Sequence, residues 1–278
     1  MPELPEVETV RRALVKCTRH QIITQYYYDR TDYLQTGHTL CPALAGSRIE
    51  TVERRGKLLA IRLSKPFVLL HHLGMSGRIL HTPQEAPLAK HTHLRIRFQN
   101  GWELRQWDPR RFGYAAVFRD EEILEYAPWA EMGADPLMVS PQQFFALVQG
   151  RNKPIKHFLL DQSGIAGVGN IYADEALFRA KIHPCTPCAQ LTQRQIGQLL
   201  QHLQHVLEES IAAGGSSTHD FQTLDGTLGA FQHQHRVYRR TGLPCPGCQH
   251  PIEKTVTAGR STHFCPRCQP WPTPIQPA

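Results

Sequence analysis

The sequence predicts an α+β protein of several domains, and three observations support this fold class. Residues 1 to about 134 contain short apolar segments separated by turn residues, which is typical of strands. From about 135 to 213, apolar residues recur every three or four positions, which indicates helices. Two Cys-x-x-Cys pairs follow near the C-terminus, a pattern typical of a zinc-binding hairpin. A chain of 278 residues is long enough for about two domains.

The composition indicates which class of partner the protein binds and in which cellular compartment it lies. The chain has 31 Lys and Arg against 24 Asp and Glu, a net charge of +7, which favours a polyanionic partner, although many basic proteins bind no nucleic acid. The sequence lacks the run of about 18 apolar residues that a membrane span needs. Acidic residues stand where a signal peptide needs basic ones, so we expect a cytoplasmic protein. Its eight cysteines are then expected to bind metal or to stay as free thiols.

The first predicted element is a helix behind Pro2 and Glu3. If Met1 is removed, Pro2 exposes a secondary amine, and α-amino groups titrate near pH 7.7–8.0, so part of it is unprotonated and able to form a Schiff base. Glu3 is a carboxylate that can relay protons beside it. The same residues also suit an ordinary helix start, where prolines and carboxylates are favoured. Local features alone favour the ordinary helix start.

The strands come next, and together they predict a two-sheet sandwich. Their clearest segments are 57–63, 67–72, 93–98 and 102–107, and Asn100-Gly101 between the last two is a hairpin signal. Two connections, 72–77 and 108–113, carry Met75, Arg110 and Phe112. Such loops either insert an apolar side chain between base pairs or are ordinary turns.

Three helices are predicted in the middle of the chain, at 141–148, 171–180 and 192–213. Glycines at 214–215 end the last one and begin a loop to about residue 230. A Gly-rich turn at 164–170 precedes the second helix, and its backbone N–H groups suit a phosphate. This signal is weak alone and is strengthened by Arg151, Lys153 and Lys156 upstream.

The C-terminal segment predicts one structural Zn²⁺. Its ligands are expected to be Cys245, Cys248, Cys265 and Cys268, because the C-x2-C-x16-C-x2-C spacing presents two thiolate pairs to a tetrahedral ion. Six basic residues against Glu253 within 236–268 suit this hairpin to phosphate binding, and protein docking is the alternative. Cys185 and Cys188 lack a partner pair and are expected to be free thiols. The Pro-rich tail is expected to be disordered.

These segments occur together, in order, in one family. Residues 1–9, 54–57, 71–77, 108–113, 167–172 and the cysteine hairpin closely resemble formamidopyrimidine-DNA glycosylases over residues 1 to about 269. The resemblance implies an N-terminal β-sandwich (1–134), a helix–two-turns–helix domain (135–230), a zinc finger (236–270) and a tail (271–278), with DNA held between the domains. A family departure is Arg239, where glycine is usual.

The resemblance also implies a bifunctional base-excision repair enzyme. Pro2 would attack C1′ of an oxidised purine nucleoside, release the base and form a Schiff base through which β- and δ-elimination cut the strand. Glu3 would exchange protons around the opening sugar, Lys57 would be the acid for β-elimination, and Arg260 would serve δ-elimination. Damaged double-stranded DNA is the implied partner, with no membrane, and a monomer is the simplest expectation. The sister family resembling endonuclease VIII has glycine in place of Leu4, which favours oxidised purines here.

The implied DNA contacts fall into four groups. Asn170 would join Lys57 and Arg260 on the phosphates beside the lesion, and His91, Arg110 and Arg151 match other contact positions. Met75, Arg110 and Phe112 would fill the gap left by the flipped nucleotide, because C1′ is inaccessible within a stacked duplex. The loop 217–226 would cap the flipped base. A DNA-binding protein without enzyme activity is the competing hypothesis, and it does not explain Pro2, Glu3, Lys57 and Arg260 together.

Overall fold

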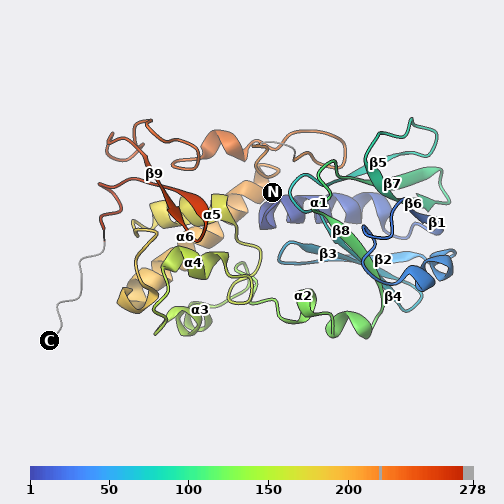
Figure 1. The fold of residues 1–278 in the computed structure, drawn as a ribbon, viewed down its shortest axis with the longest axis horizontal. Coiled ribbons are helices and arrows are strands. Elements are labelled where there is room, and N and C mark those ends of the chain that lie inside the picture. Colours follow the sequence, from blue (N-terminus) through green and yellow to red (C-terminus); the bar gives the residue numbers. More distant parts are fainter. Residues whose placement is uncertain (219–220, 272–278) are drawn as a thin grey trace. The chain divides into compact units, whose positions relative to one another are not determined.

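The computed structural model describes residues 1–218 and 221–271. They form two compact units, Met1–Met132 with Ser210–Gln232, and Gly133–Glu209 with the segment from His233 onward (Figure 1). The tail predicted to be disordered, 271–278, lies outside the described residues except for Trp271. Within the described residues, no helix is long and apolar enough to cross a membrane.

The first unit contains the predicted sandwich: two antiparallel sheets of four strands each within the described residues. One sheet has the order β1-β6-β7-β5, with the bounds Ile23–Tyr28, Thr92–Phe98, Trp102–Trp107 and Arg78–Pro83. The other has the order β2-β3-β4-β8, with the bounds Ile49–Arg55, Leu58–Leu63, Phe67–His72 and Tyr114–Arg119. All four segments singled out from the sequence are therefore confirmed as strands, with Asn100-Gly101 connecting β6 to β7.

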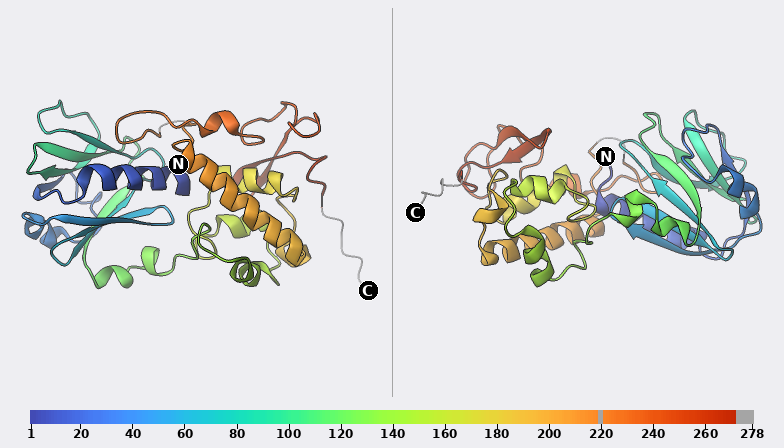
Figure 2. Two further views of the ribbon diagram at one scale, coloured as in Figure 1. Left: turned by 180° about the vertical axis from the view of Figure 1, so that it is seen from behind. Right: turned by 60° about the horizontal axis from the view of Figure 1, so that its bottom comes forward.

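Helix α1 (Leu4–Thr18) packs with both sheets in one apolar core and runs alongside them (Figure 2, left). It contributes Val7, Val10 and Leu14, which lie on one helix face because they recur every three or four residues. Ile61 of β3 and Ile96 of β6 are buried in the same cluster. The core thus fixes the helix whose first turn follows Pro2.

Strands β3 and β4 are apolar on both faces because both faces are covered. Leu58, Ala60 and Leu70 belong to a second buried cluster with Trp129 of α2 (Ala127–Ala130). Up to residue 132, this unit also contains two short 3-10 helices, η1 (His38–Leu44) and η2 (Glu122–Leu124). A strand buried on two sides reads as a continuous apolar run and does not alternate.

The second unit holds the helices and the cysteine hairpin. Its elements are α3 (Pro141–Val148), α4 (Ile155–Leu160), α5 (Asn170–Arg179), η3 (Cys188–Gln190), most of α6 (Gln193–Ala212), and the hairpin strands β9 (Glu253–Thr257) and β10 (Arg260–Phe264). Three predicted helices are confirmed as α3, α5 and α6. Helix α4 was not expected, because six residues are too few to show a helical period.

Residues 213–218 and 221–230 form no helix or strand, as expected for a loop, and lead into η4 (Phe231–Gln234). Phe221 and Leu224 of this segment are buried in the core of the first unit, to which Ser210–Gln232 belongs. The domain limits drawn from the sequence stay a prediction.

Candidate active site

The N-terminus is held by the start of α1. Pro2 and Glu3 are buried, and Glu3 caps the helix in a reciprocal arrangement with Glu6: the Glu3 backbone N–H donates to Glu6 Oε2 at 2.8 Å, while the Glu3 side chain accepts from the backbone N–H of Glu6. The second oxygen of Glu6 accepts the backbone N–H of Ser216 at 2.7 Å. The ordinary helix start and a rigidly held terminal residue are therefore compatible, because the helix cap immediately follows Pro2.

Lys57 precedes β3 and is almost buried, with 9% of its surface exposed. The next residue, Leu58, pairs across the sheet with His72 of β4, which brings the imidazole close to Lys57. Burial, and then the charge of Lys57, lower the pKa of His72 to about 4. His72 was not singled out from the sequence, and only the strand pairing identifies it.

The two predicted wedge loops form one rigid piece. A Cβ atom added to Gly74 would lie 2.3 Å from the backbone nitrogen of Gly113, so the two backbones are in contact. The buried Asp108 carboxylate accepts hydrogen bonds from Ser76 Oγ at 2.6 Å and from the backbone N–H of Gly113 at 2.8 Å. Asp108 therefore ties the start of one loop to the end of the other.

The structure brings the three predicted gap-filling residues onto this piece. Met75 and Phe112 remain 40% and 54% exposed and lie on loops whose backbones are in contact. The guanidinium of Arg110 lies 5.0 Å from the centre of the Phe112 ring. An exposed apolar pair beside a cation can enter a base stack from the groove.

His91 joins the same part of the unit. Its backbone carbonyl accepts the N–H of Asp108 at 2.9 Å, and its ring lies 6.4 Å from that of His93. His93 is fixed by Asp29 at 3.0 Å and by the Asp108 carbonyl at 3.0 Å. His91 itself has a positive φ of 70°, which only a few non-glycine residues adopt.

In the second unit, Asn170 and Arg260 are brought together. Asn170 is the first residue of α5, and its Nδ2 donates to the carbonyl of Ser261 at 2.8 Å, next to the exposed Arg260 at the start of β10. Arg151 lies elsewhere in this unit, where its Nε donates to the Leu147 carbonyl at 2.6 Å.

Lys156 was expected to strengthen the phosphate site, and the structure corrects this. Its ammonium is fully buried, 2.6 Å from Asp174 Oδ1 and 2.8 Å from Thr262 Oγ1, so it anchors β10. The other Asp174 oxygen accepts the backbone N–H of His263 at 3.0 Å. Lys153 is likewise paired, with Asp161.

Glu175 anchors the chain that leads into the hairpin. Its buried carboxylate accepts the backbone N–H groups of Arg236, Val237 and Tyr238 at 2.9–3.0 Å. Burial raises the pKa of Glu175, against the opposing effect of these hydrogen bonds. Two successive carboxylates of α5 thus hold both ends of the hairpin region.

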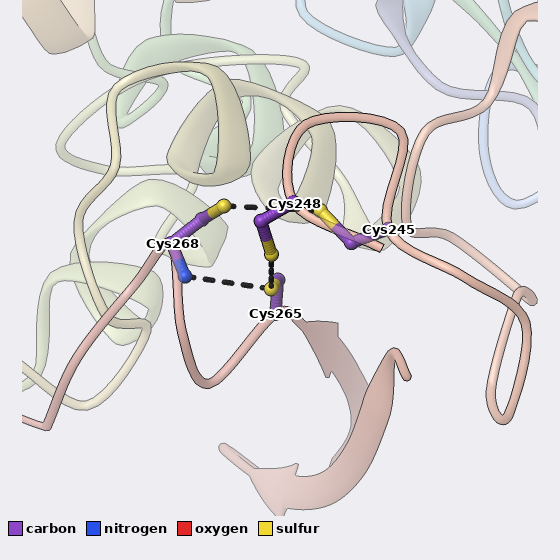
Figure 3. Close-up of side chains that lie close together, drawn as sticks. All are labelled: Cys245, Cys248, Cys265 and Cys268. Carbon is purple, nitrogen blue, oxygen red and sulfur yellow. Dashed lines mark hydrogen bonds between the residues drawn. The ribbon is translucent and has the colours of Figure 1, made fainter. Parts of the chain in front are cut away.

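The four predicted zinc ligands converge (Figure 3). Cys245, Cys248, Cys265 and Cys268 place their sulfur atoms within 4.8 Å of one another, and the Cys248–Cys265 sulfur distance is 3.5 Å. Four thiolates at this separation fit one tetrahedral Zn²⁺ without an open position, which is the pattern of a structural ion.

The other cysteine pair does not form such a group. Among the described residues, the four cysteines of the hairpin are the only cluster with enough close ligands for a metal ion. Burial raises the pKa of Cys188 to about 11, and Cys185 Sγ contacts Thr257 Oγ1 at 3.4 Å. Both are free thiols, as expected.

Comparisons with known proteins match the whole arrangement. Three family models match in order: the formamidopyrimidine-DNA glycosylase N-terminal domain over residues 1–115, the H2TH domain of the same family over 132–222, and a zinc finger found in FPG and IleRS over 242–270. The formamidopyrimidine-DNA glycosylases of Geobacillus kaustophilus and Gluconobacter oxydans are 40% and 42% identical, covering 97% of this chain and 100% of each relative.

Solved structures agree. The Lactococcus lactis FPG mutant G226P with DNA containing Fapy-dG superposes with a TM-score of 0.91 at 37% identity, and the Lactococcus lactis Fpg with abasic-site DNA with a TM-score of 0.90 at 37%. MutM with DNA containing carbocyclic 8-oxo-G gives 0.89 at 37%. Each comparison covers 97% of this chain and 100% of the other.

Proposed function

Because this chain belongs to the formamidopyrimidine-DNA glycosylase family, we propose that Pro2 is the nucleophile of its reaction and that Glu3 moves the protons. The enzyme removes oxidised purines from duplex DNA in base-excision repair, and strand cleavage at the resulting abasic site is typical of the family. It carries one structural zinc ion. The observation that carries the assignment of Pro2 is its position immediately before a helix cap made by Glu3 and Glu6.

The proposed chemistry proceeds in balanced steps. The Pro2 nitrogen, freed by loss of Met1, attacks C1′ while the bond to the base breaks and the base leaves with a proton. Glu3 protonates the ring oxygen as the sugar opens, which leaves an iminium between Pro2 and C1′. The Glu3 carboxylate then takes a 2′ proton while the bond from C3′ to the 3′ phosphate breaks, with Lys57 as the acid. Loss of the 4′ proton breaks the bond from C5′ to the 5′ phosphate with the help of Arg260, and water then hydrolyses the iminium and frees Pro2.

Residues of both units supply the proposed DNA contacts. Lys57, Asn170 and Arg260 bind phosphates beside the lesion, and the short link from Asn170 to Ser261 supports joint action of the last two. The exposed Met75 and Phe112, with Arg110, replace the extruded nucleotide. His91 and Arg151 contact the duplex. The capping loop 217–226 covers the flipped base; its residues 219–220 lie outside the described residues.

The finer properties are also proposals. We infer domains at 1–134, 135–230 and 236–270, with residues 210–232 packed on the first unit's core. We infer a monomer, testable by light scattering. A cytoplasmic location suits a DNA-repair enzyme whose relatives named above are bacterial.

Borohydride trapping on a duplex that contains 8-oxoguanine tests the nucleophile. Borohydride reduces the iminium, so the wild-type protein, with Met1 removal checked by intact mass, is expected to give a covalent adduct. Pro2→Gly should lose most of it, whereas Pro5→Ala, which alters another proline of the helix start, should keep it. An adduct of wild-type yield in Pro2→Gly would remove Pro2 from the mechanism.

A further inference from the structure

The loop that leads to His91 has little apolar packing of its own. Residues 84–91 form no helix or strand, and most of them are exposed, including Leu88 at 55%. At its end His91 adopts the unfavourable left-handed conformation described above. Such a conformation persists only when its surroundings determine it, so something else must hold this loop.

Side chains of β7 do so. Arg105 Nη2 donates to the carbonyl of Ala86 at 2.7 Å, and Nη1 donates to that of Pro87 at 2.8 Å. Trp107 Nε1 donates to the carbonyl of Lys90 at 2.8 Å. With the Asp108 bond to His91, β7 and the residue after it bind the loop at successive points along its length.

Glu103 fixes the arginine. Its carboxylate is fully buried and accepts from Arg105 Nε, and it also pairs with Arg95 at 2.9 Å and Arg97 at 3.2 Å. Although burial raises the pKa of Glu103, hydrogen bonds from Arg95, Arg105 and Arg97 lower it overall, which keeps the carboxylate charged. With Nε held, the two remaining nitrogen groups of Arg105 point in fixed directions, and they match two consecutive carbonyls.

We propose that Arg105 is a positioning residue for DNA binding: held by Glu103, it fixes loop 84–91 and so sets the place of His91. This inference rests on the proposed contact of His91 with DNA. Arg105 is buried, and in this proposal it affects DNA binding only through the loop and His91. The geometry predicts that Arg105 changes affinity for DNA and leaves the chemical step almost unchanged.

The chain offers a matched control. Arg97→Met and Arg105→Met each remove one guanidinium that binds Glu103, with the same change of charge, and each leaves Glu103 two arginine partners. Only Arg105 reaches the loop; Arg97 donates instead to Gln25 on β1 at 3.2 Å. If Arg105→Met folds poorly, Arg105→Lys is a milder variant: it retains the charge but cannot make both hydrogen bonds to the carbonyls of Ala86 and Pro87.

Three measurements test the proposal on the full-length, zinc-loaded protein. The first is the Kd for a duplex containing a tetrahydrofuran abasic-site analogue; we expect Arg105→Met to bind about tenfold more weakly and Arg97→Met within about twofold of wild type. The second is hydrogen exchange of residues 84–91, which should accelerate in the Arg105 variants alone. The third is the single-turnover rate at saturating DNA, which should stay within about twofold.

A double-mutant cycle with His91→Ala completes the test. If Arg105 acts through His91, the double variant binds DNA no more weakly than His91→Ala alone. Equal Kd values for Arg97→Met and Arg105→Met, or fully additive losses in the cycle, would refute the positioning role while the DNA contact of His91 stands. A wild-type Kd for His91→Ala would refute that contact, and the positioning role with it.

Discussion

The buried ion pair between Lys156 and Asp174 gives the sharpest prediction for stability. Lys156→Met removes the ammonium and leaves the Asp174 carboxylate, which is 0% exposed, with only the imidazole and backbone N–H of His263 as partners among the described residues. The chain contains a natural control in Lys153→Met, because the Lys153–Asp161 pair has the same N–O distance of 2.6 Å, but both side chains are 33% exposed. The two variants differ in the burial of the carboxylate left behind, and Lys156→Met also removes the hydrogen bond from the ammonium to Thr262 Oγ1.

The expected magnitudes follow from burial. Removing one partner of a buried pair costs about 3–5 kcal/mol, whereas a surface pair is worth about 0–1 kcal/mol. A buried carboxylate without its cation can take up a proton and become neutral, so the free-energy cost of protonation is an upper limit on the loss caused by the missing cation. For an ordinary aspartic acid this cost is about 4 kcal/mol at pH 7 and about 1.5 kcal/mol at pH 5. We therefore expect Lys156→Met to lose about 4 kcal/mol at neutral pH and clearly less at pH 5.

Urea unfolding followed by circular dichroism at pH 7 and pH 5 measures both differences. A companion variant, Lys156→Met with Asp174→Leu, should recover much of the loss, because no unpaired charge remains. Equal stabilities of Lys156→Met and Lys153→Met, or a loss that does not shrink between pH 7 and pH 5, would refute the argument from burial. Zinc content measured in parallel shows whether the hairpin is still folded.

Three further predictions concern other parts of the chain. Cys265→Ser should lose the zinc ion and, with it, thermal stability and DNA affinity, because one of four ligands is gone; a full zinc content by metal analysis would contradict this. Asp108→Asn should slow release of 8-oxoguanine about tenfold in single-turnover assays, because an amide offers one acceptor where Ser76 and Gly113 both donate; an unchanged rate would show that the wedge loops need no such link. Between pH 6.5 and pH 4, His72 should contribute a loss of folding stability of up to about 3 kcal/mol, because its pKa is lowered to about 4 and only the unfolded chain takes up the proton; His72→Asn should make the fall of stability with pH shallower in urea titrations, and a slope identical to wild type would refute this contribution.

The sequence identified the central strands of both sheets and left the edge strands unnamed. Strands β3, β4, β6 and β7 lie inside their sheets, whereas β1, β5, β2 and β8 form the edges. A central strand is paired on both sides and packed against the core, so its own residues carry a clear apolar pattern. An edge strand such as β1, with only Ile23 fully buried, is defined by its neighbours. Short-range patterns therefore predict the inside of a sheet better than its margin.

The candidate site shows the same division. The zinc ligands could be predicted from spacing alone, because the ion imposes that spacing. The proposed role of Pro2 could not be predicted in this way, since its local sequence favours an ordinary helix start, and only the family resemblance suggested the chemistry. Lys156 was misjudged because its partners lie 18 and 106 residues away, at Asp174 and Thr262, and no local pattern records them. His72 was missed for the same reason, because strand pairing brings it to Lys57.

Two hydrogen bonds that the Glu6 carboxylate accepts connect distant parts of the chain. One of its oxygens accepts the backbone N–H of Glu3, the residue after the proposed nucleophile, and the other accepts that of Ser216, just before the proposed capping loop. The residue after the proposed nucleophile and the segment that precedes the proposed capping loop are therefore bound by the same side chain, although Glu6 and Ser216 are 210 residues apart in the chain. In the proposed mechanism, the place of the segment at Ser216 and the place of the residue after Pro2 both depend on this one carboxylate.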